Sequence, residues 1–233
     1  MPASLGRIQE YLCRSSWESS EIVVVDDGSR DATARIAREA GASVLTNAGN
    51  RGKGYSVRRG MLAAKGDWAL LTDADLSAPI EELDKLWSAA GREAAPVAFG
   101  SRALDRSLIG VRQPPFRDFT GRLFNLAMRA VTGLPYRDTQ CGFKLFETHA
   151  AREIFSRQRL DGFGFDVEVL YIARSLGYRC LEIPVRWNDV AGTKVSLFRG
   201  LVAFTGLFRV RWSGLVGRYN RRLLKENWPV QFR

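Results

Sequence analysis

Two carboxylates at positions 73 and 75 are the side chains of this sequence best placed to do chemistry together. Asp73 and Asp75 follow a short apolar run, Trp68 to Leu71, which is typical of a buried strand. Residues two apart in an extended chain point to the same side, so both carboxylates would face one point where the strand leaves the core. Such a pair can hold a hard divalent cation that completes its shell with water and phosphate oxygens. An ordinary acidic surface turn is the alternative interpretation.

A second acidic pair, Asp26 and Asp27, follows another apolar run and is succeeded by Gly28 and Ser29. Carboxylates at such a turn could accept hydrogen bonds from a base or a sugar. We expect Gly28 to permit the close approach of a ligand. Capping of the next helix is the alternative role for this turn.

The elements that would position these residues alternate along the chain. We expect strands at 21–25, 43–46, 68–71, 97–99 and 179–187, and helices at 31–40, 55–65, 80–90, 116–132, 147–158 and 166–176. Ser77 and Pro79 should cap and open the helix at 80–90, residues 101–115 should form a long irregular loop, and Pro184 should place its strand at a sheet edge. The alternation predicts an α/β fold with a doubly wound, mostly parallel sheet and helices on both faces. Ligands of such sheets bind outside the carboxyl ends of the strands, where both acidic pairs fall.

Composition narrows the function classes. The chain has 233 residues, enough for one large domain or for one domain and a tail. Its formal net charge of +10 favours an anionic partner such as nucleic acid, a phosphorylated substrate or an anionic membrane surface. Three widely spaced cysteines indicate reduced thiols in the cytosol. The glycines near 52–54 fit neither the dinucleotide-binding nor the Walker pattern, so a metal and basic side chains would have to hold any phosphates.

Six ordered strings carry a family resemblance: Val-Asp-Asp-Gly-Ser at 25–29, Asn-Arg-Gly-Lys-Gly at 50–54, Thr-Asp-Ala-Asp-Leu-Ser at 72–77, Gly-Ser-Arg at 100–102, Asp-Thr-Gln-Cys-Gly-Phe-Lys-Leu-Phe at 138–146 and Phe-Asp-Val-Glu at 165–168. With them the chain resembles family 2 glycosyltransferases of the GT-A fold. Within that family it is most similar to dolichyl-phosphate β-glucosyltransferases and bacterial polyprenyl-phosphate relatives. The resemblance implies a single catalytic domain over residues 1–195 with a Rossmann-like sheet.

The implied activity is inverting transfer of a sugar, glucose being favoured, from a UDP-sugar to a polyprenyl or dolichyl phosphate. GDP-mannose as donor is the alternative within the class. Mg²⁺ or Mn²⁺ would be held by Asp75 and Asp73. The residues implied to bind the nucleotide-sugar are Asp26, Asp27, Gly28, Ser29, Lys53 and Asp73.

The acceptor phosphate would need positioning and charge compensation, because it is already anionic near neutral pH. Guanidinium groups match phosphate geometry, which favours Arg117, grouped with the catalytic aspartates, and Arg122. Arg102 and Lys144 are further candidates for this phosphate. The residues expected to form the wall of the site are Asp138, Gln140, Asp166 and Glu168. A solvated helix face is the alternative for each arginine, and helix capping for Asp166.

The C-terminal segment, 196–233, is basic at its ends and apolar in its middle, which suits contact with a membrane surface or an ordinary docked helix. We therefore expect a peripheral protein on the cytoplasmic face of a membrane. The family begins with a strand carrying Pro-x-x-Asn-Glu, and none precedes residue 5 here, which predicts a truncated start and a missing first strand. An inactive transferase or a basic nucleic-acid-binding module remains as the alternative of another class, although no nucleic-acid motif is present.

Overall fold

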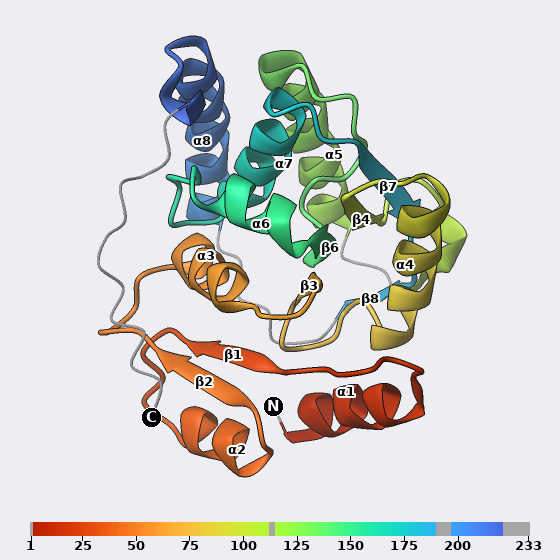
Figure 1. The fold of residues 1–233 in the computed structure, drawn as a ribbon. Coiled ribbons are helices and arrows are strands. Elements are labelled where there is room, and N and C mark those ends of the chain that lie inside the picture. The colour runs from red at the N-terminus through yellow and green to blue at the C-terminus, as the bar shows by residue number, and fades with distance from the viewer. Residues whose placement is uncertain (1, 112–114, 190–196, 221–233) are drawn as a thin grey trace.

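The computed structural model describes residues 2–111, 115–189 and 197–220 (Figure 1). Helices and strands alternate through most of the chain, as the sequence predicts. The helices are α1 (Pro2–Arg14), α2 (Thr33–Glu39), α3 (Lys53–Ala63), α4 (Leu83–Arg92), α5 (Pro115–Thr132), α6 (Thr148–Phe155), α7 (Phe165–Ser175) and α8 (Leu197–Leu215), with short 3₁₀ turns η1 (Ile80–Glu82), η2 (Arg106–Leu108) and η3 (Arg218–Asn220). The strands are β1 (Val23–Asp26), β2 (Ser43–Thr46), β3 (Trp68–Thr72), β4 (Val97–Ser101), β5 (Ile109–Val111), β6 (Phe143–Glu147), β7 (Cys180–Pro184) and β8 (Trp187–Asn188).

Within the part of the chain that the structure describes, the strands form three sheets, and the four-stranded sheet has the order β3-β6-β4-β7. Three of the five strand pairs are parallel (β1 with β2, β4 with β7, β5 with β8), and β6 runs antiparallel to both of its neighbours. The predicted mostly parallel sheet is thus a mixed one, because the unpredicted strand β6 is inserted against the direction of β3 and β4. In the described residues β1 pairs with β2 alone and β3 with β6 alone, so no strand pair joins these two sheets.

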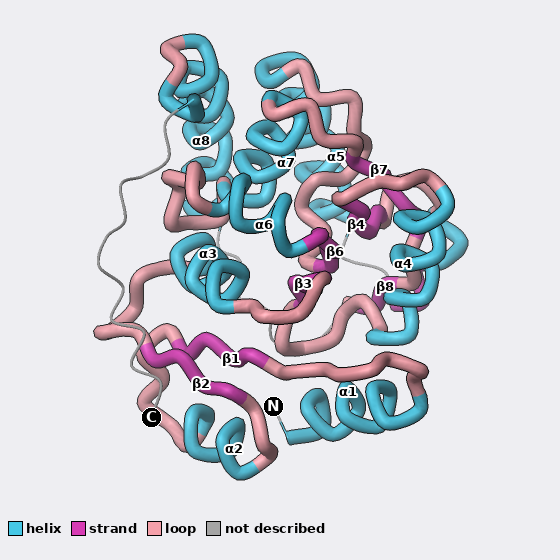
Figure 2. The backbone as a smooth tube through the Cα atoms, viewed as in Figure 1, coloured by secondary structure: helices cyan, strands magenta, loops and turns pink. Residues whose placement is uncertain are grey.

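Helices cover both faces of the four-stranded sheet (Figure 2). Side chains alternate along β6, so Phe143 and Leu145 pack with α4 on one face, while Phe146 packs with α6 and α7 on the other. A smaller cluster around Ala37 and Leu5 joins α1 and α2 to the β1–β2 pair. The layered arrangement of the predicted α/β fold is confirmed.

Several local predictions need correction. Ser77 does not cap a helix: its N–H donates to Asp75 Oδ1 at 3.0 Å, and η1 begins directly after Pro79 without a side-chain cap. The loop predicted at 101–115 contains η2 and β5, since β5 finds a partner in β8. Pro184 does lie in an edge strand, because β7 is the last strand of the sheet.

The apolar C-terminal segment is helical. Helix α8 packs against α5 and α7, with Leu207 and Val210 buried and the Phe204 ring 5.2 Å from that of Phe124. Residues 190–196 and 221–233 lie outside the described part of the chain. Among the helices of the described part, none combines the length and the hydropathy that crossing a bilayer requires.

Candidate functional site

The turn after β3 carries both predicted metal-binding aspartates. Asp73 continues the β3–β6 pairing by donating its N–H to Gly142 O at 3.1 Å, and its side chain is 37% exposed. The chain then reverses at Leu76, whose φ of 51° is unusual for a residue with a side chain. Asp75 is exposed and accepts the Ser77 N–H on Oδ1 at 3.0 Å. Both carboxylates therefore project from the edge of the sheet at the carboxyl end of β3.

Lys53, the first residue of α3, reaches into this acidic turn. Its Nζ lies 2.7 Å from Asp73 Oδ1 and 5.9 Å from the centre of the Phe165 ring. Burial alone would lower the pKa of Lys53, but the carboxylates of Asp166, Asp73 and Asp75 outweigh it and raise the pKa. The lysine therefore carries its positive charge beside Asp73, in the centre of the candidate site, and its predicted contact with the nucleotide-sugar stays a prediction.

The donor set of the turn fits a magnesium or manganese ion. In the described residues no group of three or more histidine, cysteine, aspartate or glutamate side chains gathers in a way that could hold a metal by itself. Two carboxylates on a turn match the usual coordination of Mg²⁺, which binds one or two carboxylates and completes its coordination shell with water and substrate phosphates. Asp73 and Asp75 fit an ion that would be bound together with a nucleotide diphosphate.

Asp27 organises the neighbouring loop. Its carboxylate accepts the N–H groups of Arg51 and Gly52 at 2.7 and 2.9 Å and the Asn47 amide at 2.8 Å. Burial would raise the pKa of Asp27, but these hydrogen bonds more than offset it and the pKa is lowered. The carboxylate that we expected on a nucleoside is therefore engaged by loop 47–52 and holds that loop against β1.

The rest of this turn is also internally bonded. Asp26 is buried and accepts the Ser29 N–H at 3.0 Å. Gly28 has φ of +81°, and a Cβ there would lie 2.8 Å from the carbonyl carbon of Gly49. The close approach that requires this glycine is made by the chain's own loop, not by a ligand as we expected.

The partly buried Arg102 forms a bidentate pair with the buried carboxylate of Asp138. Arg102 Nε and Nη2 lie 2.7 and 2.9 Å from the two Asp138 oxygens, and the Arg102 N–H bonds the same carboxylate. Burial would raise the pKa of Asp138, but the guanidinium lowers it. Because this guanidinium is committed to Asp138, the structure gives no support to Arg102 as an acceptor-phosphate ligand.

Lys144 and Asp166 form a buried pair. The Lys144 side chain is 0% exposed, its Nζ bonds an Asp166 oxygen, and it also donates to Cys141 O at 2.6 Å. A side chain without exposed surface cannot contact an acceptor, so the prediction that Lys144 binds the acceptor phosphate is wrong. Its physical role is to neutralise Asp166 underneath the site.

The remaining predicted residues are spread more widely. Glu168 is buried and accepts the Leu160 N–H at 2.8 Å and the Tyr219 hydroxyl at 2.9 Å, so it is an internal anchor instead of part of a site wall. Gln140 presents a buried Nε2 without a hydrogen-bond partner. Arg122 lies exposed on α5, and the side chain of Arg117, on the same helix, is outside the described residues.

Gly142 is a site residue that sequence reasoning missed. A Cβ at this position would lie 2.0 Å from Asp73 Oδ2, so only glycine leaves room for that carboxylate. The pairing of Leu71 with Lys144 and Thr72 with Phe143 sets Gly142 beside Asp73. Gly142 belongs to the motif at residues 138–146, but its contact with Asp73 could not be predicted without knowing the antiparallel register of β6 against β3.

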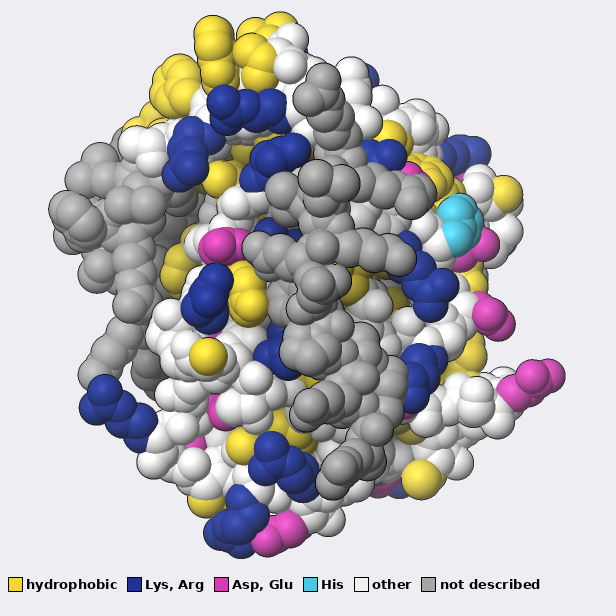
Figure 3. Space-filling view, turned by 60° about the vertical axis from the view of Figure 1, so that its left-hand side comes forward, with side chains coloured by type: hydrophobic (Ala, Val, Ile, Leu, Met, Phe, Trp, Pro, Cys, Tyr) yellow, Lys and Arg dark blue, Asp and Glu magenta, His cyan; other side chains and the backbone are white. Residues whose placement is uncertain are grey.

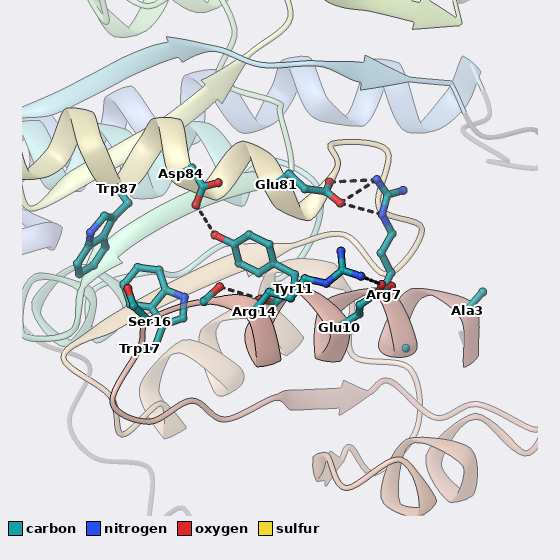
Figure 4. A pocket seen from close by; sticks show the side chains of 12 residues that line it. Ala3, Arg7, Glu10, Tyr11, Arg14, Ser16, Trp17, Glu81, Asp84 and Trp87 are labelled. Atoms are coloured by element: carbon teal, nitrogen blue, oxygen red, sulfur yellow. Dashed lines mark hydrogen bonds and ion pairs between the residues drawn. The ribbon is translucent and has the colours of Figure 1, made fainter.

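A well-defined pocket lies elsewhere, between α1 and α4 (Figure 4). It has a volume of about 830 Å³. Arg7 forms an ion pair with Glu81 there, and Asp84 accepts a hydrogen bond from the Tyr11 hydroxyl at 2.6 Å. Its lining includes neither aspartate of the β3 turn. The acidic turn with its lysine is therefore the better candidate site, because its carboxylates and the Lys53 ammonium meet at the carboxyl end of β3.

Comparison with known proteins places this chain in a family. The profile of glycosyl transferase family 2 matches residues 2–155, and the chain belongs to this family. It is 39% identical to the dolichyl-phosphate beta-glucosyltransferase of Drosophila melanogaster, over 76% of this chain and 58% of the relative, and 35% identical to that of Mus musculus, over 83% and 63%. The chain thus spans about three fifths of the length of these curated relatives.

Solved structures agree on the fold. Glucosyl-3-phosphoglycerate synthase from Mycobacterium tuberculosis, in complex with Mn²⁺, UDP-glucose and phosphoglyceric acid, superimposes with a TM-score of 0.66 at 17% identity, covering 91% of this chain and 76% of that one. The predicted GT-A fold is confirmed. At this identity the likeness concerns the backbone alone, and the ligands named are those of the mycobacterial enzyme.

Proposed function

We propose that this chain transfers glucose from UDP-glucose to a polyprenyl or dolichyl phosphate, with inversion at the sugar carbon. The observation that carries the proposal is the acidic turn of Asp73 and Asp75 with Lys53 at its centre, in a chain that is 39% identical to a dolichyl-phosphate beta-glucosyltransferase. The turn lies at the carboxyl end of β3, where sheets of this kind bind their ligands.

The site residues have distinct tasks in this reaction. Asp75 and Asp73 would hold Mg²⁺ or Mn²⁺, and the bound ion supplies charge compensation for the departing diphosphate. Lys53 adds a positive charge at the same place and fixes the Asp73 carboxylate through their 2.7 Å contact. Asp27 positions loop 47–52, whose backbone would then meet the nucleotide.

The acceptor side needs orientation more than base catalysis. A lipid phosphate carries its nucleophilic oxygen already deprotonated near neutral pH, so the protein has to bring it in line with the sugar carbon and offset its charge. We assign this task to Arg122 and Arg117 of α5. Arg102 takes an indirect part, because it fixes Asp138 and the 138–144 segment that borders Asp73.

The test is transfer of radiolabelled glucose from UDP-glucose to a detergent-dispersed polyprenyl phosphate in the presence of Mg²⁺ or Mn²⁺. We expect Asp75→Asn to abolish transfer. Asp67→Asn is the matched control, because Asp67 is an exposed aspartate at the opposite end of β3, and it should leave the rate unchanged.

Other outcomes would redirect the proposal. Transfer from GDP-mannose but not from UDP-glucose would keep the class and change the donor. Equal activity of the Asp75→Asn variant and the unaltered chain would contradict the assigned site. Salt-sensitive binding to RNA or DNA without turnover of any nucleotide-sugar would replace the enzyme by a basic binding module.

A further inference from the structure

Helix α8 exposes an unusually apolar face. Phe208, Trp212, Leu215 and Val216, here called the α8 face, are 65%, 61%, 64% and 47% exposed. Large hydrophobic side chains are normally exposed singly on soluble proteins, whereas these four form one continuous stripe, because residues four and seven or eight apart lie on the same side of a helix. Figure 3 shows hydrophobic side chains gathered at the top of the molecule, where the C-terminal end of α8 lies in Figure 1.

Basic side chains border this stripe on both sides. At about 100° per residue, positions 209 and 211 fall on opposite edges of the α8 face. Both are exposed arginines, and Arg211 also lies 3.5 Å from the Tyr171 hydroxyl. In Figure 3, lysine and arginine side chains lie directly below the hydrophobic side chains at the top of the molecule. An apolar stripe with cationic edges is the pattern of a helix that lies in a membrane interface.

The sequence around α8 strengthens the charge argument. From residue 190 to 225 the chain has eight lysine and arginine residues and no aspartate or glutamate. Each basic residue near an anionic bilayer adds roughly 1 kcal/mol of attraction. An anionic lipid surface would repel carboxylates, which explains why this segment contains no aspartate or glutamate. An uncharged protein partner would not explain it.

Helix α8 connects this face to the candidate site. Gly206 lies against Gly164, the residue before α7, and the first turn of α7 carries Asp166. From Gly206 to Leu215 the helix rises by about 13 Å, so the far end of the α8 face lies two to three helical turns from this contact with the start of α7. The neighbouring helix α5, which carries Arg122, also exposes Leu123 and Leu126.

We propose that the α8 face docks this protein on the surface of an anionic lipid bilayer. Phe208, Trp212, Leu215 and Val216 enter the interfacial layer, and Arg209 and Arg211 contact the headgroups. The lipid acceptor of the proposed function would explain why such docking is useful, but the docking itself needs no turnover, so the two can be tested apart.

The test is flotation of the protein with vesicles of phosphatidylcholine containing about a third phosphatidylglycerol. We expect Phe208→Ser/Trp212→Ser to weaken vesicle binding at least about tenfold, because two large apolar side chains no longer enter the interface. Arg209→Gln/Arg211→Gln should lose the preference for anionic vesicles, and salt should weaken binding of the unaltered chain. The matched control is Val111→Ser, a 53% exposed hydrophobic residue of β5, which should bind normally.

Three results would overturn the docking proposal: no binding of the unaltered chain, equal binding by Phe208→Ser/Trp212→Ser, or a dimer in solution that this double variant converts to monomer. The last would show that a second copy covers the face. Failure of the proposed function is recognised separately, as absence of glucose transfer to a detergent-dispersed acceptor. The double variant should retain that transfer, because its substitutions lie outside the site.

Discussion

Replacement of Gly142 by alanine is the sharpest test of how the site is built. The new methyl carbon would lie 2.0 Å from Asp73 Oδ2 and 2.4 Å from its Cγ, whereas ordinary contacts begin at 3.4 Å. The carboxylate must therefore move by more than about 1 Å, and a displacement of that size in catalytic machinery can lower a rate about 100-fold. Because the Asp73 side chain is partly exposed and can rotate away, the free energy of unfolding should fall by only about 1 kcal/mol.

The assay has two readouts. Glucose transfer measures kcat/KM, and titration of Mn²⁺ in the presence of UDP measures metal affinity; both should fall in Gly142→Ala while the urea unfolding midpoint changes little. Gly91→Ala is the control, because Gly91 lies in α4 with no atom near its missing Cβ, and alanine there should stabilise the helix by about 0.5–1 kcal/mol without affecting transfer. Unchanged Mn²⁺ affinity and transfer in Gly142→Ala would refute the reasoning.

Three further predictions concern stability. Lys144→Met leaves the Asp166 carboxylate buried without its partner and should lower the free energy of unfolding by about 3–5 kcal/mol in urea titrations. The double variant Lys144→Met/Asp166→Asn should recover part of this loss. A loss below about 1 kcal/mol would contradict a buried ion pair. Because the pKa of Asp27 is lowered in the folded protein, the stability that its carboxylate contributes is complete above its ordinary pKa of 3.8 and is lost as the pH falls through its folded-state pKa. The free energy of unfolding of Asp27→Asn should therefore fall less between pH 6 and pH 3 than that of the unaltered chain. Parallel losses in the two proteins would argue against this role of Asp27. Gly54→Ala puts a Cβ 2.4 Å from the Leu160 carbonyl oxygen, a backbone atom that cannot easily move. The substitution should lower the melting temperature by an amount equivalent to about 1–3 kcal/mol. An unchanged melting temperature would mean that the backbone at Gly54 and at Leu160 is not in close contact.

Local patterns were sufficient where the signal lies within one element. The strand at 43–46 and the helix at 116–132 could be predicted nearly to the residue, because hydrophobic periodicity and turn residues mark them. The acidic turn of Asp73 and Asp75 could be placed at the end of its strand for the same reason. The family resemblance rested on such strings and needed no knowledge of which strands pair.

Side-chain partnerships could not be predicted in the same way. Arg102 and Lys144 both looked like free cations for a phosphate, yet each is paired with a carboxylate distant in sequence, Asp138 and Asp166. A basic residue gives no local sign of whether its charge is already neutralised, since that depends on which segments fold together. Burial of a charge without a partner is so unfavourable that folding itself selects the pair.

By itself, the sequence determined the alternation of elements, the position of the acidic turn, the basic character of the last forty residues and the family. Only the tertiary structure decided that β6 runs antiparallel beside β3, which brings Gly142 against Asp73 and Lys144 beneath the site. It also decided which side of α8 is left exposed, because α5 and α7 bury the opposite side. The physical reason is the same in both cases: periodicity reports what one element can bury, whereas strand direction and helix docking depend on contacts between residues far apart in the chain.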